Sequence, residues 1–342
     1  MYLISPQKKQ YKANLHCHSV ISDGKKTPQE LKDMYKSHGY AVLSITDHET
    51  PHDHSCLNDE DFITITGYEA YIRPNAENRS DVYEEEIHMN LFARDPHNTA
   101  MVWYLPKYCR YISKEQQDTY RKVGPQAHRP FTVEGINEFV KVARENGYIV
   151  SYNHPYWSMQ DEATILQYEG FFSMEMHNYS SFLLNGLEYN APLYDKWVAS
   201  GARIFCHSAD DNHNKYPDDS PQCDSFGGFT MIMPEAFTYD ALFEAMEQGE
   251  MYSSMGPTFR EISVRDGVLH VECSDVKWIT AFTGSKRPNR VCAETGKTVT
   301  SADIPLDPRA KFVRVSVMDA DGNFADTRAF SRAEVGLDGV ES

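Results

Sequence analysis

Two histidines near the start of the chain are spaced so that one metal ion could bind both. His16 and His18 lie two residues apart in NLHCHSVISDG, residues 14–24. On a β-strand, residues two apart project from the same face, and imidazole is a common metal ligand. The Ser-Asp-Gly turn that follows leaves Asp23 free to point back at the pair. One such pair is a weak signal, so the rest of the chain decides its meaning.

Further imidazoles and carboxylates stand where other predicted strands end. With the opening pair they make nine candidate metal ligands: His16, His18, Asp23, His48, Glu69, His88, His154, Asp211 and His213. A catalytic zinc-like site uses three or four protein ligands, so nine predict two or three divalent ions. Glu69 could bridge two of them with its two oxygens. Neutral imidazole with carboxylate suits zinc, manganese or iron.

Alternating strands and helices are predicted to carry these residues. Thr27 to Glu30 has the form of a capping box with proline at the first helical position, and Gly39 ends that helix. Strands are predicted at residues 41–46, 62–66, 87–92, 148–152, 171–176, 203–208 and 229–233. This amounts to about seven βα units, a class of fold in which the chemistry gathers at the carboxyl ends of parallel strands.

The pattern changes after Pro257. Residues 258–342 show alternating apolar and polar residues divided by turn signals, without a helical period. We therefore expect a catalytic domain over residues 1–257 and a small all-β, sandwich-like accessory domain over residues 258–342.

The ordered set of motifs resembles the polymerase and histidinol phosphatase (PHP) superfamily of metal-dependent phosphoesterases. H-x-H with a following SDG, TDHE, GYE, the His88 strand, NHP and a closing D-x-H occur in that order between residue 13 and about residue 255. The resemblance implies an α/β fold, a distorted (β/α)7 barrel, with a two- or three-metal centre at one end. It also implies a ligand role for each of the nine residues.

Candidate catalytic residues are His207 and Asp211. They share the alternation of one predicted strand, so His207 reaches the substrate as an acid or phosphate donor if the strand runs that far. A packed core histidine is the equal alternative. His177 ends another predicted strand and is a candidate substrate-binding residue, with a structural role as its alternative. Asp47 and Asp210 either orient the His154 and His213 rings or cap their own strand ends.

The segment 94–130 is predicted to be an insertion. It holds seven basic and three acidic residues, a net charge of +4 inside a chain of −17, with four interleaved tyrosines. We expect a lid over the metal site in which Arg110 and Arg129 bind the substrate phosphate. A solvated helical excursion is the alternative.

Composition limits the partners. With 33 basic and 50 acidic residues the chain repels the backbone of a long nucleic acid. No apolar run has the length of a membrane span, so no membrane partner is expected. Seven cysteines without C-x-x-C spacing favour a reducing compartment, which makes the cytoplasm the expected location. The oligomeric state stays open.

These features predict a metal-dependent hydrolase of phosphoester bonds. The expected substrate is a small phosphorylated molecule, either a phosphomonoester or a cyclic or nucleotide phosphodiester, attacked by a hydroxide held between the ions. Two alternatives remain: an exonuclease on short oligonucleotides, or a vestigial barrel whose β domain is a binding module. Metal content separates the last from the other two.

Overall fold

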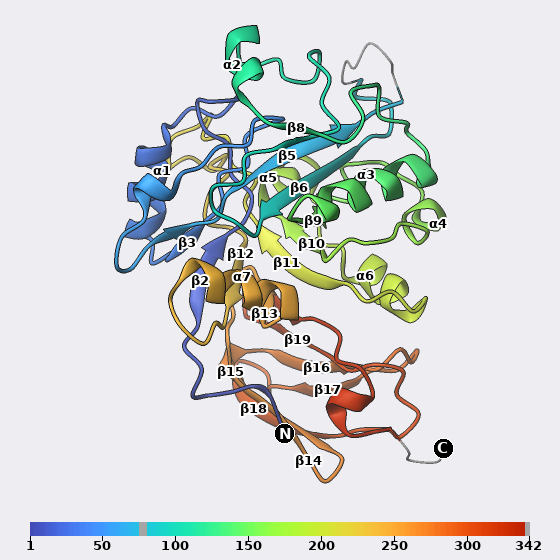
Figure 1. Ribbon diagram of the computed structural model, residues 1–342. Helices are drawn as coiled ribbons and strands as arrows, with labels where there is room; N and C mark the ends of the chain where they lie inside the picture. Colours follow the sequence, from blue (N-terminus) through green and yellow to red (C-terminus); the bar gives the residue numbers. More distant parts are fainter. Residues whose placement is uncertain (75–80, 339–342) are drawn as a thin grey trace.

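The computed structural model describes residues 1–74 and 81–338 of the chain. The fold is mixed α/β, with two large sheets at its centre (Figure 1). The first sheet has five strands in the order β11-β10-β9-β6-β5. Their bounds are β5 Gly67–Ile72, β6 Ile87–Ala93, β9 Tyr148–Tyr152, β10 Ser173–Asn178 and β11 Phe205–Ala209.

The second sheet has nine strands in the order β17-β16-β19-β20-β13-β12-β2-β3-β4. Three of them come from the N-terminal part: β2 Tyr11–Asn14, β3 Val42–Leu43 and β4 Ile63–Thr64. Two follow the last ligand: β12 Phe229–Ile232 and β13 Met251–Ser254. The remaining four are β16 Trp278–Phe282, β17 Asn289–Cys292, β19 Arg314–Met318 and β20 Phe324–Thr327.

Seven α-helices pack around these sheets or lie in the loops between strands. They are α1 Pro28–Ser37, α2 Lys114–Thr119, α3 Val133–Glu145, α4 Glu162–Ile165, α5 Tyr179–Asn185, α6 Ala191–Ala199 and α7 Tyr239–Gln248, and two short 3-10 helices cover Ser55–Leu57 and Ala333–Val335. The predicted capping box is confirmed, because Thr27 caps α1 and Glu30 bonds back to it. Phe139 of α3 and Trp197 of α6 are buried in the core on the five-stranded sheet. None of the helices in the described ranges has the length and apolarity needed to cross a bilayer.

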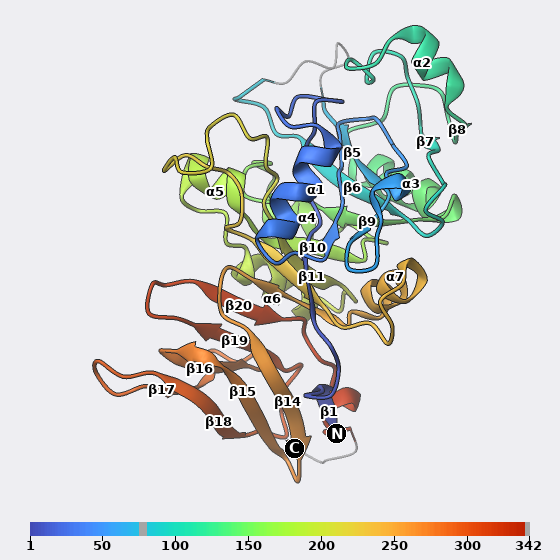
Figure 2. The same ribbon diagram turned by 90° about the vertical axis from the view of Figure 1, so that its left-hand side faces the viewer.

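The described residues after 258 form strands and one 3-10 helix but no α-helix. A separate four-stranded sheet has the order β1-β14-β15-β18, from β1 Tyr2–Ile4, β14 Phe259–Arg265, β15 Val268–Val276 and β18 Val299–Pro305. The N-terminal strand thus pairs within the C-terminal part (Figure 2), and the nine-stranded sheet runs through both parts. The domain boundary at residue 257 stays a prediction.

No closed barrel appears among the ladders of the described residues. Two isolated parallel bridges nevertheless link the two sheets, His48 to Glu69 and Cys17 to Asn212. The expected unbroken series of parallel βα units is wrong at two strands, because β12 runs antiparallel to β2, and β6 runs antiparallel to both β5 and β9. The alternation in its sequence predicts a strand but not the direction in which it runs.

The insertion at 94–130 contains α2 and the two-stranded sheet of β7 Met101–Val102 and β8 Lys122–Val123. In both views it lies at the end of the molecule opposite the C-terminal strands (Figures 1 and 2).

Candidate metal centre

The fold brings all nine predicted ligands to one edge of the sheets. His16, His18, His48, His154, Asp211 and His213 follow the carboxyl ends of β2, β3, β9 and β11. Glu69 lies on β5. His88 is the second residue of β6. Because β6 runs antiparallel to β5 and β9, its beginning lies where those two strands end. The direction of β6 therefore explains how a ligand at the start of a strand reaches the same edge.

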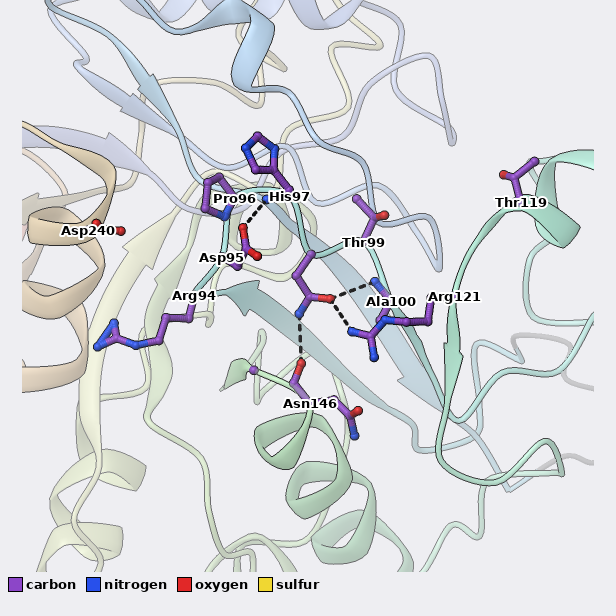
Figure 3. A pocket seen from close by; sticks show the side chains of 12 residues that line it. Arg94, Asp95, Pro96, His97, Thr99, Ala100, Thr119, Arg121, Asn146 and Asp240 are labelled. Carbon is purple, nitrogen blue, oxygen red and sulfur yellow. Dashed lines mark hydrogen bonds between the residues drawn. The ribbon is translucent and has the colours of Figure 1, made fainter.

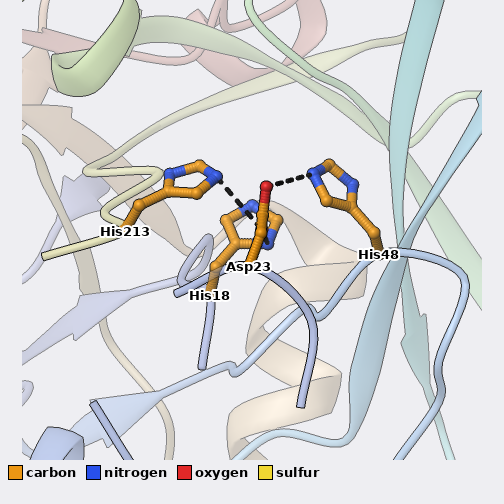
Figure 4. A group of neighbouring side chains, drawn as sticks. All are labelled: His18, Asp23, His48 and His213. Atoms are coloured by element: carbon orange, nitrogen blue, oxygen red, sulfur yellow. Dashed lines mark ion pairs between the residues drawn. The ribbon is translucent and has the colours of Figure 1, made fainter. Parts of the chain in front are cut away.

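One group of donors consists of His18, Asp23, His48 and His213 (Figure 4). Their donor atoms all lie within 4.8 Å of one another. Asp23 points between the rings, with an oxygen 3.4 Å from His213 Nε2 and the other 3.8 Å from His48 Nε2.

Glu69 is the centre of the remaining donors. It is 1% exposed, and its two oxygens lie close to nitrogens of five imidazole rings. The distances are 3.2 Å to His16 Nε2, 3.5 Å to His18 Nε2, 2.9 Å to His48 Nδ1, 3.2 Å to His88 Nδ1 and 3.3 Å to His154 Nε2. No lysine or arginine among the described residues forms an ion pair with Glu69.

Asp211 completes this part of the cluster. Its Oδ1 lies 3.0 Å from His18 Nε2 and 3.2 Å from His16 Nε2. Two ligands bound at about 2.1 Å to one tetrahedral ion are about 3.4 Å apart, so the spacing suits donors that share an ion. Three groups of donors are close enough to hold an ion: His18 with Asp23, His48 and His213; His16 with His18 and Glu69; and His48 with Glu69 and His88. Because His18 and His48 each belong to two of these groups, the three groups do not amount to three ions.

Unpaired ring nitrogens give an independent test of this fit. His18 Nδ1, His88 Nε2 and His154 Nδ1 are buried and have no hydrogen-bond partner among the described residues. A buried polar atom without a partner costs free energy, and coordination of a metal removes that cost. The donor set therefore fits divalent metal ions.

The protonation states of two of the histidine ligands agree with this fit. Burial, with the neighbouring rings of His213 and His48, lowers the pKa of His18 to about 4. Burial also lowers the pKa of His88. Both rings are then neutral at pH 7, the form that binds metal. Burial alone would raise the pKa of Glu69, but the His16, His88 and His48 rings outweigh it and hold that pKa well below its ordinary value.

Glu175 orients two of the ligands from behind. Its Oε1 accepts a hydrogen bond of 2.7 Å from His16 Nδ1, which leaves His16 Nε2 facing Glu69. Its Oε2 accepts from the backbone N–H of His154 at 2.7 Å and from Asn178 Nδ2 at 2.8 Å. A carboxylate that fixes the tautomer of a metal-binding histidine is a common feature of metal sites.

In the described part of the chain, Asp47 and Asp210 neither orient the His154 and His213 rings nor cap their own strand ends, because their carboxylates accept hydrogen bonds from the backbone of other segments. Asp47 accepts hydrogen bonds from the backbone N–H groups of Ser19 and Ser22, at 2.8 and 3.1 Å, and so holds the turn that carries Asp23. Asp210 accepts from the backbone N–H groups of residues 226–228.

A cavity of about 470 Å³ opens above the donors. Arg110 and Tyr111 of the insertion line it, so the predicted insertion does reach the metal site. The other lining residues include Arg73, Trp157, Leu183, Leu184, Lys215 and Tyr216, which the sequence analysis missed. A signal existed for Arg73, because Glu69, Tyr71 and Arg73 alternate along one strand and its end and so share a face.

Three predicted site residues do not line this cavity. Arg129 is 1% exposed and forms a two-pronged ion pair with Glu49, so its assignment to substrate binding is wrong. His177 is fully buried, and its Nδ1 lies 2.9 Å from the Glu188 carbonyl oxygen. His207 is fully buried, with its Nδ1 3.1 Å from Ser173 Oγ. The strand ends at Ala209 and Asp211 has a φ of 54°, so the alternation that linked His207 to Asp211 is broken.

Comparison with known proteins gives structural neighbours only. No family model and no curated protein matches the chain. One solved structure is a two-domain protein from Bacteroides vulgatus that contains a predicted PHP-like metal-dependent phosphoesterase; it is 13% identical, the match covers 96% of this chain and 98% of that one, and the TM-score is 0.43.

Two further neighbours cover less of the chain. A predicted metal-dependent phosphoesterase from Bifidobacterium adolescentis is 16% identical. The match covers 68% of this chain and 94% of that one, with a TM-score of 0.36. An amidohydrolase from Chromobacterium violaceum with bound sulfate and no metal is 15% identical, over 62% and 93%, with a TM-score of 0.37. At such TM-scores the likeness carries no argument of its own, so function has to follow from the geometry of the site.

Proposed function

We propose that this protein is a metal-dependent hydrolase that cleaves phosphoester bonds of small molecules. The observation that carries the proposal is Glu69, a buried carboxylate that five imidazole rings surround and that no lysine or arginine of the described residues neutralises. A buried anionic cluster of this kind is stable when cations occupy it. Two or three divalent ions held by the nine ligands meet that need.

The cavity above the cluster favours an anionic substrate. The Arg73 and Arg110 guanidinium groups line it beside the ligands His48 and His88. Guanidinium groups bind phosphoryl oxygens in a planar, directed way, so they suit a phosphoester better than a neutral amide.

In the proposed mechanism, side chains of the protein bind and orient the phosphoryl group and accept a proton from the attacking water. When bound, the ions supply Lewis acidity and lower the pKa of water. Arg73 and Arg110 hold oxygens of the bound phosphoryl group. Burial would raise the pKa of Asp211, but the His16 and His18 rings lower it overall, so this carboxylate is ionised and is the group that we assign to accept the proton of the attacking water.

The proposal extends to the architecture. The bridges His48 to Glu69 and Cys17 to Asn212 join the two sheets at the ligand edge, which supports one distorted (β/α)7 barrel in which β6 and β12 run antiparallel to their neighbours. Residues 258–342 would then be an accessory part that supports the barrel through the shared nine-stranded sheet.

The test is hydrolysis by protein reconstituted with manganese or zinc. We expect release of nitrophenol from 4-nitrophenyl phosphate or bis(4-nitrophenyl) phosphate, abolished by a chelator and restored by metal. Hydrolysis of a short oligonucleotide but of neither ester would favour the exonuclease alternative. No hydrolysis of any of the three by metal-loaded protein would overturn the proposal.

A further inference from the structure

The metal-site cavity differs from a larger cavity of the molecule in what its cations do. That larger cavity, of about 840 Å³, lies between the insertion and α3 (Figure 3). Arg121 donates to Asn98 Oδ1 at 2.9 Å, Arg94 pairs with Glu247 at 2.9 Å and His97 with Asp53 at 2.7 Å. Its cations are already paired within the chain, so nothing there calls for a ligand.

The metal-site cavity has one wall of exposed apolar side chains. Leu183 and Leu184 of α5 are 39% and 75% exposed, and Tyr111 and Tyr216 are 42% and 46% exposed. All four line this cavity, although they come from three separate segments of the chain. Single exposed apolar residues are ordinary, but a group of them around a polar site marks a binding surface.

The cavity also has a cationic wall. Arg73 is 7% exposed, stacks on Tyr71 with its guanidinium 4.0 Å from the ring centre, and pairs with Glu86 through Nε. Its Nη1 is buried without a hydrogen-bond partner in the described part of the chain. The exposed Arg110 guanidinium likewise forms no ion pair with a described residue. These donors are available to an anionic group of a substrate.

From these two walls we infer that the substrate is a phosphomonoester whose alcohol part is a bulky aryl or alkyl group. The inference rests on the proposed function and specifies its substrate class. A monoester has three free phosphoryl oxygens, enough for the ions and for Arg73 Nη1 together, whereas a diester has two. In the reaction the bond from phosphorus to the ester oxygen breaks, a bond to a water oxygen forms, and the ester oxygen takes a proton to give the free alcohol and inorganic phosphate.

The apolar group of the substrate lies against Leu183 and Leu184. These leucines are exposed, so replacing them by serine does not remove a part of the core. Leu187, 56% exposed and just beyond α5, does not line the cavity and provides a matched control.

The experiment compares 2-phenylethyl phosphate with ethyl phosphate, whose leaving alcohols are similarly acidic. We expect metal-loaded wild type to prefer the phenylethyl ester in kcat/KM by about 10- to 100-fold, the worth of burying one aromatic group. The double variant Leu183→Ser and Leu184→Ser should lower that ratio by about 10-fold, and Leu187→Ser should leave it unchanged. A wild type without the preference, or a ratio that the double variant does not lower, would overturn the inference.

Failure of the proposed function is distinguishable from failure of the inference. If neither ester is hydrolysed, the proposed function fails. Binding of 3-phenylpropylphosphonate and propylphosphonate, measured by calorimetry, then decides the inference alone. Tighter binding of the phenyl compound that the leucine variant loses supports the apolar wall, and equal binding of the two overturns it.

Discussion

Glu49 and Glu69 are two buried glutamates with opposite surroundings. They are 3% and 1% exposed, and the N–H of Glu49 donates to the carbonyl oxygen of Glu69 at 2.8 Å. Arg129 meets both oxygens of Glu49 and also donates to the Tyr71 and Val102 carbonyl oxygens. Among the described residues, the Glu69 carboxylate meets only imidazole nitrogens and, at 2.9 Å, Asn153 Nδ2. The chain itself neutralises Glu49 and leaves Glu69 for a cation.

This difference separates structural charge from functional charge in the same neighbourhood. Arg314 in the C-terminal part is another buried arginine that neutralises carboxylates within the chain, because it pairs with Asp326 and, at 2.7 Å, with Asp195. A guanidinium is a permanent cation, so a site that contains one needs no ion from solution. Imidazole can be neutral, so a carboxylate among imidazoles remains a metal site.

The largest expected effect comes from removing the charge of Glu69, the carboxylate at the centre of the histidine cluster. We expect Glu69→Gln to lower the phosphoesterase kcat/KM by about 1,000-fold or more, because it removes a ligand that touches five rings and metal catalysis is worth several kcal/mol. Metal should also raise the melting temperature of wild type but not of this variant. Equal activity and equal metal response in the two proteins would contradict the assignment.

Breaking the buried ion pair between Arg129 and Glu49 should instead affect stability. Arg129→Met leaves Glu49 buried and unpaired, which we expect to lower the free energy of unfolding by about 3–5 kcal/mol in urea titrations. Adding Glu49→Leu to this variant should restore much of the loss. A stable Arg129→Met protein with a raised KM would show that Arg129 binds substrate after all.

Glu175 should have an intermediate effect through His16. Glu175→Gln weakens the bond that orients the ring, so metal affinity should fall by about 10- to 100-fold in competition with a chelator. Glu162→Gln is a suitable control, since Glu162 is an exposed carboxylate paired with Lys196. Equal affinities for the two variants would remove the positioning role.

The smallest effect is expected for the insertion. Arg110→Ala should raise KM for a phosphomonoester by about fivefold, the worth of one partly exposed ionic contact, with little change in kcat. Arg121→Ala should leave KM unchanged, because Arg121 faces the other cavity. Equal KM values for both variants would leave the insertion without a role in binding.

The spacing of the sequence motifs predicted the nine donors because strand ends impose their own geometry. Residues at the carboxyl ends of neighbouring parallel strands meet at one edge of the sheet. His88 is an exception, because it lies at the start of β6 and reaches that edge through an antiparallel direction that the spacing did not predict. The capping box of α1 was predictable for a similar reason, since it depends on residues three apart.

Other features depended on tertiary contacts that no local pattern contains. Arg110 and Arg129 belong to the same basic segment, and only the fold shows that Arg129 is buried against Glu49. The positive φ of Asp211 turns the chain away from the strand alternation that included His207. The apolar wall combines residues from three segments, so sequence spacing could not reveal it.

Metal bound per chain tests the central claim most directly. Wild type and His16→Ala would be reconstituted with manganese or zinc, freed of loose metal and measured by elemental analysis. The nine donors predict two or three equivalents of metal per chain in wild type and a clear fall in the variant. Less than one equivalent in wild type, unchanged in His16→Ala, would contradict the metal centre and turn attention to residues 258–342.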